Sequence, residues 1–114
     1  MHEMSIAANI LEIAEQQAAQ AQARIINRIE VEVGLLAGVE ISALEFCFET
    51  ARMMSDLTSS SALVIHPVAG RGRCPDCRLD FPVEFFVVLC PVCGQTNVKI
   101  LQGRELKVRS INVD

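Results

Sequence analysis

Residues 74–94 read CPDCRLDFPVEFFVVLCPVCG and hold four of the five cysteines of the chain. The pattern is C-x-x-C, a spacer of twelve residues, and a second C-x-x-C. Two tight turns of this kind can direct four thiolates to one tetrahedral centre, which suits zinc at Zn–S distances of about 2.3 Å. The sequence therefore predicts a zinc site. Its ligands are Cys74, Cys77, Cys90 and Cys93.

Other uses of this cysteine segment are less favoured. An iron centre of rubredoxin type needs the same four sulfurs and stays open as the alternative metal. A redox C-x-x-C is disfavoured because there are two pairs and no thioredoxin-like βαβ pattern around them. A closed four-sulfur site leaves no position for water, so we expect a structural ion whose binding supplies the folding free energy of the segment. We also expect Gly94 to adopt a positive φ after the second pair.

Strand patterns flank the cysteine segment on both sides. ALVIHPV at 62–68 precedes it, and the extended pattern ELKVRSINV at 105–113 follows it. A third strand is predicted at RIEVEVG, residues 28–34, where apolar residues alternate with glutamates. The cysteine segment is therefore predicted to be an insertion between two strands of one sheet.

Two helices complete the predicted core. Residues 5–24 have apolar side chains at helical spacing, with Ser5 as the expected N-cap. Residues 41–54 form the second helix, where Ser42 and Glu45 match a capping box. The predicted fold is α+β, with two helices on a small three-stranded sheet and an inserted zinc-ribbon-like domain.

The predicted domain limits follow from this order. An α/β domain spans residues 1–69 and is completed by 102–114, and the inserted zinc-binding domain spans 70–101. A chain of 114 residues is long enough for one core plus such a satellite.

Composition excludes several classes of function. The net charge is −4 and the pI is near 5.1, without a basic cluster, which argues against nucleic acid as the main partner. No stretch approaches the roughly 20 apolar residues of a membrane span. The N-terminus lacks the features of a signal peptide, so we expect a cytoplasmic protein with reduced thiols.

The first three residues, MHE, form a possible second metal site. The α-amine of Met1, the amide nitrogen of His2 and its imidazole can lie in one plane around an ion, and the amide of Glu3 can complete the square. Square-planar nitrogen coordination is typical of Ni(II) or Cu(II). The Glu3 carboxylate can add an axial oxygen or a supporting contact. The ordinary alternative is a terminal histidine that is simply solvated.

The remaining candidate residues have less specific interpretations. Cys47 is expected to be a small buried hydrophobic residue. His66 is expected to bond to backbone or water at a strand end and not to bind metal. No hydrolase, P-loop or metalloprotease motif is present, so we expect no enzymatic activity.

The combination of motifs resembles a known family along essentially the whole chain. It consists of MHEMS at 1–5, VEVGLLAGVEISAL at 31–44, CPDC at 74–77, CPVCG at 90–94 and ELKVRSINV at 105–113. Together these segments are similar to the HypA/HybF family of hydrogenase maturation nickel metallochaperones.

The resemblance implies a function. Nickel would bind at Met1, His2 and Glu3, and zinc at the four cysteines. Members pass Ni(II) to the precursor of the [NiFe]-hydrogenase large subunit together with a GTPase of HypB type, and some serve urease maturation. Glu40 follows LLAGV where family members often carry an acid, and it is a minor candidate for nickel contact. The expected oligomeric state is a monomer or a homodimer.

Two other functions stay open. The chain could be a zinc-ribbon interaction module in which MHE has no role. A zinc-ribbon nucleic-acid binder is disfavoured by the acidic pI and the lack of aromatic stacking residues. The apolar stretch FPVEFFVVL at 81–89 is either a docking surface or, as apolar residues usually are, packed against the core.

Overall fold

The computed structural model describes residues 2–84 and 88–114. The chain divides into two compact units. The first comprises Met1–Glu32, Val39–His66 and Lys107–Asp114, and the second comprises Val33–Gly38 and Pro67–Leu106. The mixed α+β class is confirmed, while the domain limits predicted at 69/70 and 101/102 stay predictions.

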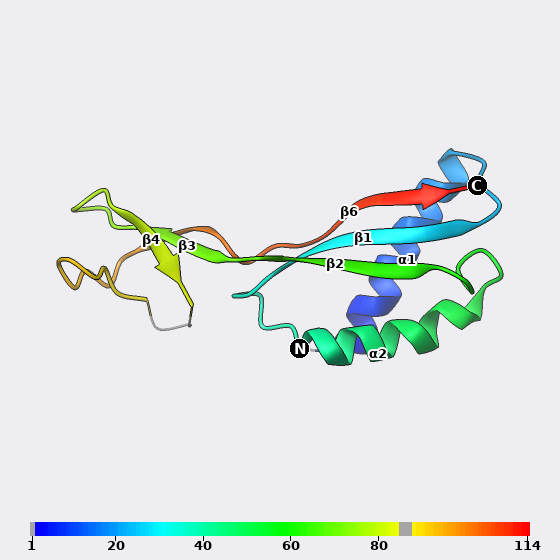
Figure 1. Ribbon diagram of the computed structural model, residues 1–114, viewed down its shortest axis with the longest axis horizontal. Coiled ribbons are helices and arrows are strands. Elements are labelled where there is room, and N and C mark those ends of the chain that lie inside the picture. Colours follow the sequence, from blue (N-terminus) through cyan, green and yellow to red (C-terminus); the bar gives the residue numbers. More distant parts are fainter. Residues whose placement is uncertain (1, 85–87) are drawn as a thin grey trace. The chain divides into compact units, whose positions relative to one another are not determined.

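The helices lie in the first half of the chain, and the four clustered cysteines lie between strands of the second half (Figure 1). The elements are α1 (Glu3–Gln20), β1 (Ile26–Gly34), α2 (Ile41–Ala51), the 3₁₀ turn η1 (Arg52–Met54), β2 (Ala62–Val68), β3 (Gly70–Arg73), β4 (Asp80–Val83), β5 (Lys99–Gln102) and β6 (Leu106–Val113). None of the helices in the described part of the chain has the length and apolarity needed to span a membrane.

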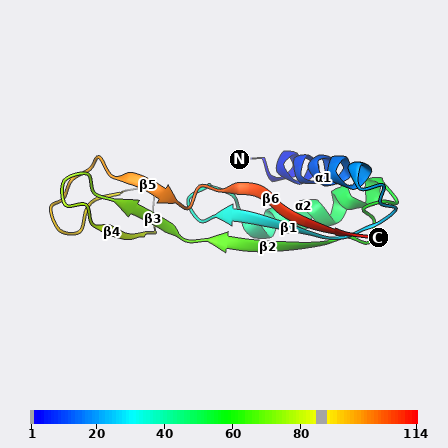
Figure 2. The ribbon, with the colours of Figure 1, turned by 90° about the horizontal axis from the view of Figure 1, so that it is seen from above.

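The predicted three-stranded sheet is confirmed, with the strand order β2-β1-β6. Figure 2 shows β1 and β2 running in the same direction and β6 in the opposite one. The antiparallel pairing begins with the N–H of Arg24, which donates to the carbonyl of Asp114 at 2.8 Å. Parallel neighbours need a crossover connection, and α2 provides it between β1 and β2.

The core of the first unit lies between this sheet and the helices. Ile29 and Val31 on β1 are fully buried, as are Leu44 and Phe48 on α2. Helix α1 lies along one face of the strands in Figure 2 and contributes a buried side. Its buried residues are Ala7, Ile10, Leu11, Ala14 and Ala18. The predicted half-buried character of the first strand, with glutamates facing away from the core, agrees with this packing.

Both predicted helix caps are wrong, although the second helix begins at the predicted residue, Ile41. Helix α1 begins at Glu3 with His2 at the N-cap, so Ser5 lies inside the first turn and is not the cap. Helix α2 begins at Ile41 with Glu40 at the N-cap, so the predicted capping box is also wrong. The hydroxyl of Ser42 donates instead to Oε1 of Glu40 at 2.7 Å. The sequence around Ser5 and Ser42 matches the capping rules, but the N-cap of each helix lies before these serines, at His2 and Glu40.

Both helices also end before the predicted residues. Gln22 adopts φ 54°, in the left-handed region, and the N–H of Ala23 donates to the carbonyl of Ala18 at 2.9 Å. This bond belongs to a common C-terminal motif that stops a helix, so α1 ends at Gln20 and not at residue 24. Helix α2 ends at Ala51 and continues only as the 3₁₀ turn.

The second unit is built on the small sheet β4-β3-β5. Its buried cluster consists of Leu36, Cys74, Phe81, Val83 and Cys90. Two of the four zinc-type cysteines therefore belong to the core of this unit. Residues 81–89 were expected either to pack or to dock. Phe81 and Val83 pack, Leu89 is 51% exposed, and residues 85–87 lie outside the described residues.

A close backbone approach in the second unit requires glycine. A Cβ at Gly34 would lie 1.9 Å from the carbonyl oxygen of Gly103, which itself has φ 117°. The N–H of Leu36 donates to that same carbonyl at 2.7 Å. The two segments can therefore approach this closely only without a side chain at Gly34.

We expect Gly34→Ala to lower the free energy of unfolding by at least about 2 kcal/mol, because the backbone of the partner segment must move. Urea denaturation of the full chain measures this change. Gly38→Ala is the control, since a Cβ there meets no atom within 4 Å and only its φ of 75° is strained. The expected loss at Gly38 is about 1 kcal/mol. An equal or smaller loss at Gly34 would contradict the close approach.

Candidate metal centre

Four cysteine sulfurs converge at one end of the small sheet. The Sγ atoms of Cys74, Cys77, Cys90 and Cys93 all lie within 4.8 Å of one another. The Sγ of Cys74 is 3.6 Å from that of Cys93, and the Sγ of Cys90 is 4.0 Å from that of Cys77. A tetrahedron with Zn–S bonds of about 2.3 Å has edges of roughly 3.8 Å, so donor type and spacing fit zinc. Within the described ranges, these cysteines form the only such group of potential ligands.

The two C-x-x-C turns have the same backbone geometry. The N–H of Arg78 donates to the carbonyl of Cys74 at 2.9 Å, and the N–H of Gly94 donates to that of Cys90 at 2.9 Å. Arg78 has φ 57° and Gly94 has φ 73°. The positive φ expected at Gly94 is confirmed. The one at Arg78 was missed, because a non-glycine residue gives no sequence signal for this conformation.

The environment of the thiols favours ionisation of some sulfurs over others. Hydrogen bonds from the backbone N–H groups of Cys93 and Val92 lower the pKa of Cys90 to about 7. The hydrogen bond with the Cys93 thiol, together with burial, raises the pKa of Cys77 to about 12. One sulfur therefore ionises first and opposes ionisation of its neighbours. A divalent cation at the centre would favour the thiolate form of all four.

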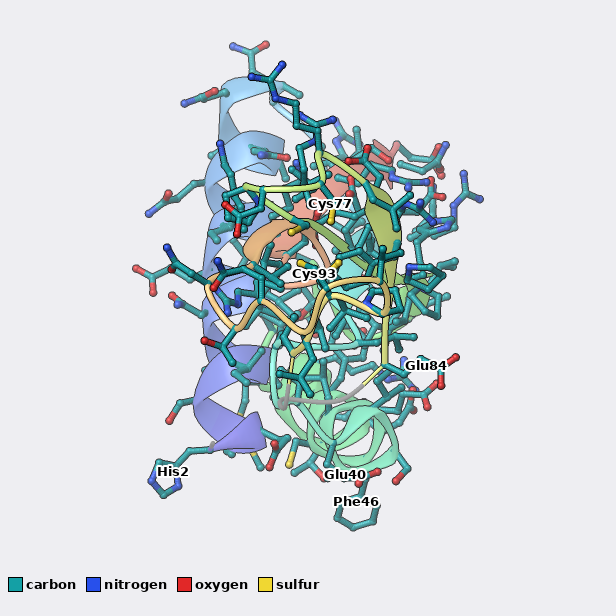
Figure 3. All side chains as sticks on the ribbon, turned by 90° about the vertical axis from the view of Figure 1, so that its left-hand side faces the viewer. His2, Glu40, Phe46, Cys77, Glu84 and Cys93 are labelled. Carbon is teal, nitrogen blue, oxygen red and sulfur yellow. The ribbon has the colours of Figure 1, made fainter. Side chains whose placement is uncertain are left out.

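Exposure differs between the two members of each turn. Cys74 and Cys90 are buried, whereas Cys77 and Cys93 are exposed. Figure 3 shows Cys77 and Cys93 on neighbouring loops with their sulfur atoms toward one another. Each turn thus anchors its first cysteine in the core and presents its second cysteine at the surface.

A side-chain bond joins the two turns outside the sulfur cluster. The amide Nε2 of Gln95 donates to Oδ2 of Asp76 at 2.7 Å. The Oε1 of Gln95 accepts the N–H of Asn97 at 3.1 Å, which fixes the orientation of the amide. The sequence did not predict this link, since nothing in the spacing marks Asp76 or Gln95 as partners.

We expect Gln95→Ala to speed the loss of zinc by about tenfold, because contacts beyond the ligands typically change metal affinity by about 10–100-fold. Transfer of zinc from the loaded protein to a chromogenic chelator measures the rate. Gln102→Ala is the matched control, since the side chain of Gln102 donates to the carbonyl of Ala69 in the same unit at 2.9 Å. Equal rates in the two variants would show that the bond between the turns does not hold the ion.

The candidate nickel residues lie at the start of α1. His2 occupies the N-cap position with φ −91° and ψ 97°, and its side chain is exposed. Figure 3 shows its imidazole projecting outward, on the same edge of the view as Glu40 and Phe46. Met1 lies outside the described residues. Among the described residues, the imidazole has no side-chain partner that would compete with a metal ion.

Glu3 and Glu40 meet at the starts of the two helices. The Oε2 of Glu3 accepts the backbone N–H of Glu40 at 3.3 Å. The carboxylate of Glu40 accepts the Ser42 hydroxyl. The structure therefore brings Glu40 beside Glu3 through its backbone, while its carboxylate is engaged elsewhere.

His66 forms a side-chain pair that the sequence did not predict. Its Nε2 lies 2.8 Å from Oε1 of Glu30 on the neighbouring strand, so the expected bond to backbone or water is wrong. Ser110 on β6 donates to the other oxygen of Glu30 at 3.2 Å. The hydrogen bonds from His66 and Ser110 hold the pKa of Glu30 below its ordinary value. Cys47 is half-buried and lies outside the four-sulfur cluster.

Comparison with protein families gives a match over residues 1–113. The matching family model is described as hydrogenase/urease nickel incorporation, metallochaperone, hypA. A hydrogenase maturation factor HypA from Chlorobaculum tepidum is 45% identical over 114 residues and covers all of both chains. One from Parabacteroides distasonis is 43% identical over 111 residues, which is 97% of this chain and 96% of that protein.

Solved structures show the same similarity in three dimensions. The solution structure of the Ni metallochaperone HypA from Helicobacter pylori matches with a TM-score of 0.73 at 29% identity. The match covers 99% of this chain and 97% of that one. A second solution structure, of HypA protein, matches with a TM-score of 0.73 at 30% identity and covers 99% and 96%.

Proposed function

Since the chain belongs to the HypA family of nickel-incorporation metallochaperones, we propose that its N-terminus carries Ni(II) for delivery to an enzyme under assembly. The family resemblance seen in the sequence is thus confirmed. The exposure of His2 is the main observation that supports this position for the nickel site. The His2 imidazole is exposed beside the chain terminus, where nitrogen donors of the backbone are also available.

The helix start favours nitrogen coordination. The first N–H groups of an α-helix have no intrahelical acceptor, so the amides of His2 and Glu3 can lose their protons without breaking a helix bond. The positive end of the helix dipole also favours the resulting negative charge. The proposed donors are the Met1 amine, these two amides and the His2 imidazole, in the square-planar arrangement that Ni(II) adopts.

Glu3 is proposed as the adjustable member of this set. Its bond to the N–H of Glu40, at 3.3 Å, is long enough to be exchanged for an axial contact with the ion. Nickel is the cargo, so coordination at a surface site permits ligand exchange with an acceptor. In this proposal Glu40 acts through its backbone and is not itself a ligand.

The four cysteines are proposed to hold a structural zinc ion. The sulfur spacing and the burial of Cys74 and Cys90 support this role, since a closed site in a small core adds folding free energy. Residues 1–69 with 102–114 would then form the nickel domain and residues 70–101 the zinc domain. No role in covalent catalysis is proposed for either site.

The proposed carrier needs an acceptor for its nickel and a partner protein for the transfer. The acceptor is proposed to be the precursor of the [NiFe]-hydrogenase large subunit, with urease as a second acceptor class named by the family description. The family resemblance in the sequence supports a GTPase of HypB type as the working partner. The proposed location is the cytoplasm. Whether the protein works as a monomer or a homodimer stays a prediction.

A blocked terminus tests the proposal directly. Adding a glycine and a serine ahead of Met1 should weaken nickel binding by about 100-fold, roughly 2.7 kcal/mol, because the amine leaves the chelate. Calorimetric titration of nickel into the zinc-loaded chain, with and without the extension, measures the change.

Zinc content serves as the control and should stay at about one ion per chain in both proteins. The rival interaction module, which needs no nickel, would take up zinc and show no nickel binding with either terminus. Nickel binding that is unaffected by the extension would place the site elsewhere in the chain.

A further inference from the structure

A hollow of about 200 Å³ lies between the two helices of the first unit. It is lined by Ala8, Leu11, Glu12, Glu15, Ala51 and Met54. Sites for small molecules usually enclose about 300–1,000 Å³ and are mostly apolar. This hollow is smaller and has two carboxylates in its wall, so it suits side chains inserted from another protein.

The hollow is lined by side chains of α1, of α2 and of the η1 turn. The two helices begin close together, where Glu3 accepts the N–H of Glu40, and they are inclined to one another in Figure 1. The outer surface between two packed helices offers ridges that a third helix can complement. An amphipathic helix bound in a groove is a common mode of peptide recognition.

Exposed large apolar side chains lie on α2 and on the η1 turn that follows it, and Met54 among them lines the hollow. Met54 is 87% exposed, Phe46 is 75% exposed and Met53 is 61% exposed. Methionine is flexible and polarisable, and it is frequent at surfaces that adapt to a partner. The exposed Met54 in the wall of the hollow, next to the exposed Met53, therefore makes this surface a candidate interface.

The acidic side chains beside the hollow favour a positively charged partner. Helix α1 carries Glu12 and Glu15 beside the hollow and has no lysine or arginine, whereas Arg52, directly after α2, pairs with Glu49 at 2.9 Å. Within residues 2–84 and 88–114, neither Glu12 nor Glu15 has a basic group within ion-pair distance. A complementary occupant must therefore bring positive charge to the hollow.

We propose that the hollow between α1 and α2 binds a basic amphipathic helix of a partner protein. Its lysine or arginine side chains would pair with Glu12 and Glu15, and its apolar side would contact Leu11 and Met54. A nucleic acid or an anionic membrane would be repelled by the same carboxylates. An isologous contact with a second copy would bring two acidic faces together. The inference needs no bound metal, so it can fail independently of the proposed nickel function.

The test uses a defined probe on the full chain. A synthetic helical peptide of about 18 residues, with leucine on one face and lysine on the other, is titrated into the ¹⁵N-labelled, zinc-loaded protein. We expect amide shifts concentrated at residues 8–15 and 51–54. A scrambled peptide of the same composition, which cannot form an apolar face, should bind at least about tenfold more weakly.

Matched variants distinguish binding at the hollow from binding that depends only on the net charge of the protein. The double variant Glu12→Gln with Glu15→Gln should weaken binding of the probe by about tenfold. Glu45→Gln with Glu84→Gln removes the same charge away from the hollow and should leave binding within about twofold. Ala8→Gln, which fills the hollow without changing charge, should also weaken binding, and all three should retain nickel binding.

Several outcomes would overturn the proposal. Equal losses in both double variants would show that the probe follows net charge only. Shifts spread over β1 and β6, or equal binding of the scrambled peptide, would exclude the hollow. Concentration-dependent self-association that shifts the same amides would assign the hollow to a second copy. Binding of anionic phospholipid vesicles at these amides would assign it to a membrane.

Discussion

Replacing Cys74 with serine is expected to abolish zinc binding and to unfold the second unit. Cys74 is fully buried beside Leu36 and Phe81, so it supplies both a ligand and part of the core. Structural zinc contributes about 10–16 kcal/mol in small metal-dependent folds, which is more than a unit of this size can lose. Metal analysis should find less than about 0.1 zinc ions per chain, against about one in the unchanged protein.

Amide spectra of the same variant measure the structural effect. Signals from residues 70–103 should lose their dispersion, while those of α1 should persist, because its buried side packs within the first unit. Cys47→Ser is the matched control, since Cys47 lies on α2 outside the sulfur cluster. If Cys74→Ser kept a full zinc ion with ordered amides, three sulfurs would suffice and the four-ligand assignment would be wrong.

Replacing His2 with alanine should remove most of the nickel affinity. The imidazole is one of the few strong donors at the terminus, and loss of a direct ligand should exceed the 10–100-fold effect of an indirect contact. We therefore expect at least about 100-fold weaker nickel binding, roughly 2.7 kcal/mol, in a calorimetric titration. The fold should not change, since His2 is exposed and its side chain makes no capping bond.

His66→Ala provides the control for histidine content. His66 pairs with Glu30 on the sheet, and among the described residues it belongs to no group of three potential ligands. Its loss should leave nickel affinity within about twofold and should affect only stability. Equal nickel loss in both variants would shift the site to the sheet, and unchanged affinity in His2→Ala would remove the terminus from the site.

The parts of the protein that depend on local spacing were the most predictable. The C-x-x-C pairs act through tight turns of a few residues, so the convergence of four sulfurs could be expected from the sequence alone. Alternation predicted the strand around Val31, and helical spacing predicted both helices. Helix caps were less predictable, since the capping rules favoured Ser5 and Ser42 while the N-cap positions are held by His2 and Glu40.

Contacts between distant segments could not be predicted from one sequence. The links Glu3–Glu40, Glu30–His66 and Asp76–Gln95 join residues on different elements or turns. No sequence pattern pairs these residues with one another, and charged residues at such positions are ordinarily solvated. The positive φ of Arg78 could not be predicted either, because it is explained only by the equivalent position of Gly94 in the second turn.

The strand order β2-β1-β6 has a consequence for how the protein is made. The sheet of the first unit needs β6 as its edge strand, and β6 is translated after every cysteine of the chain. The sulfur-rich segment is thus fully synthesised while the first unit still lacks an edge strand. The sheet of the first unit is therefore completed by a strand that is synthesised after the whole second sheet.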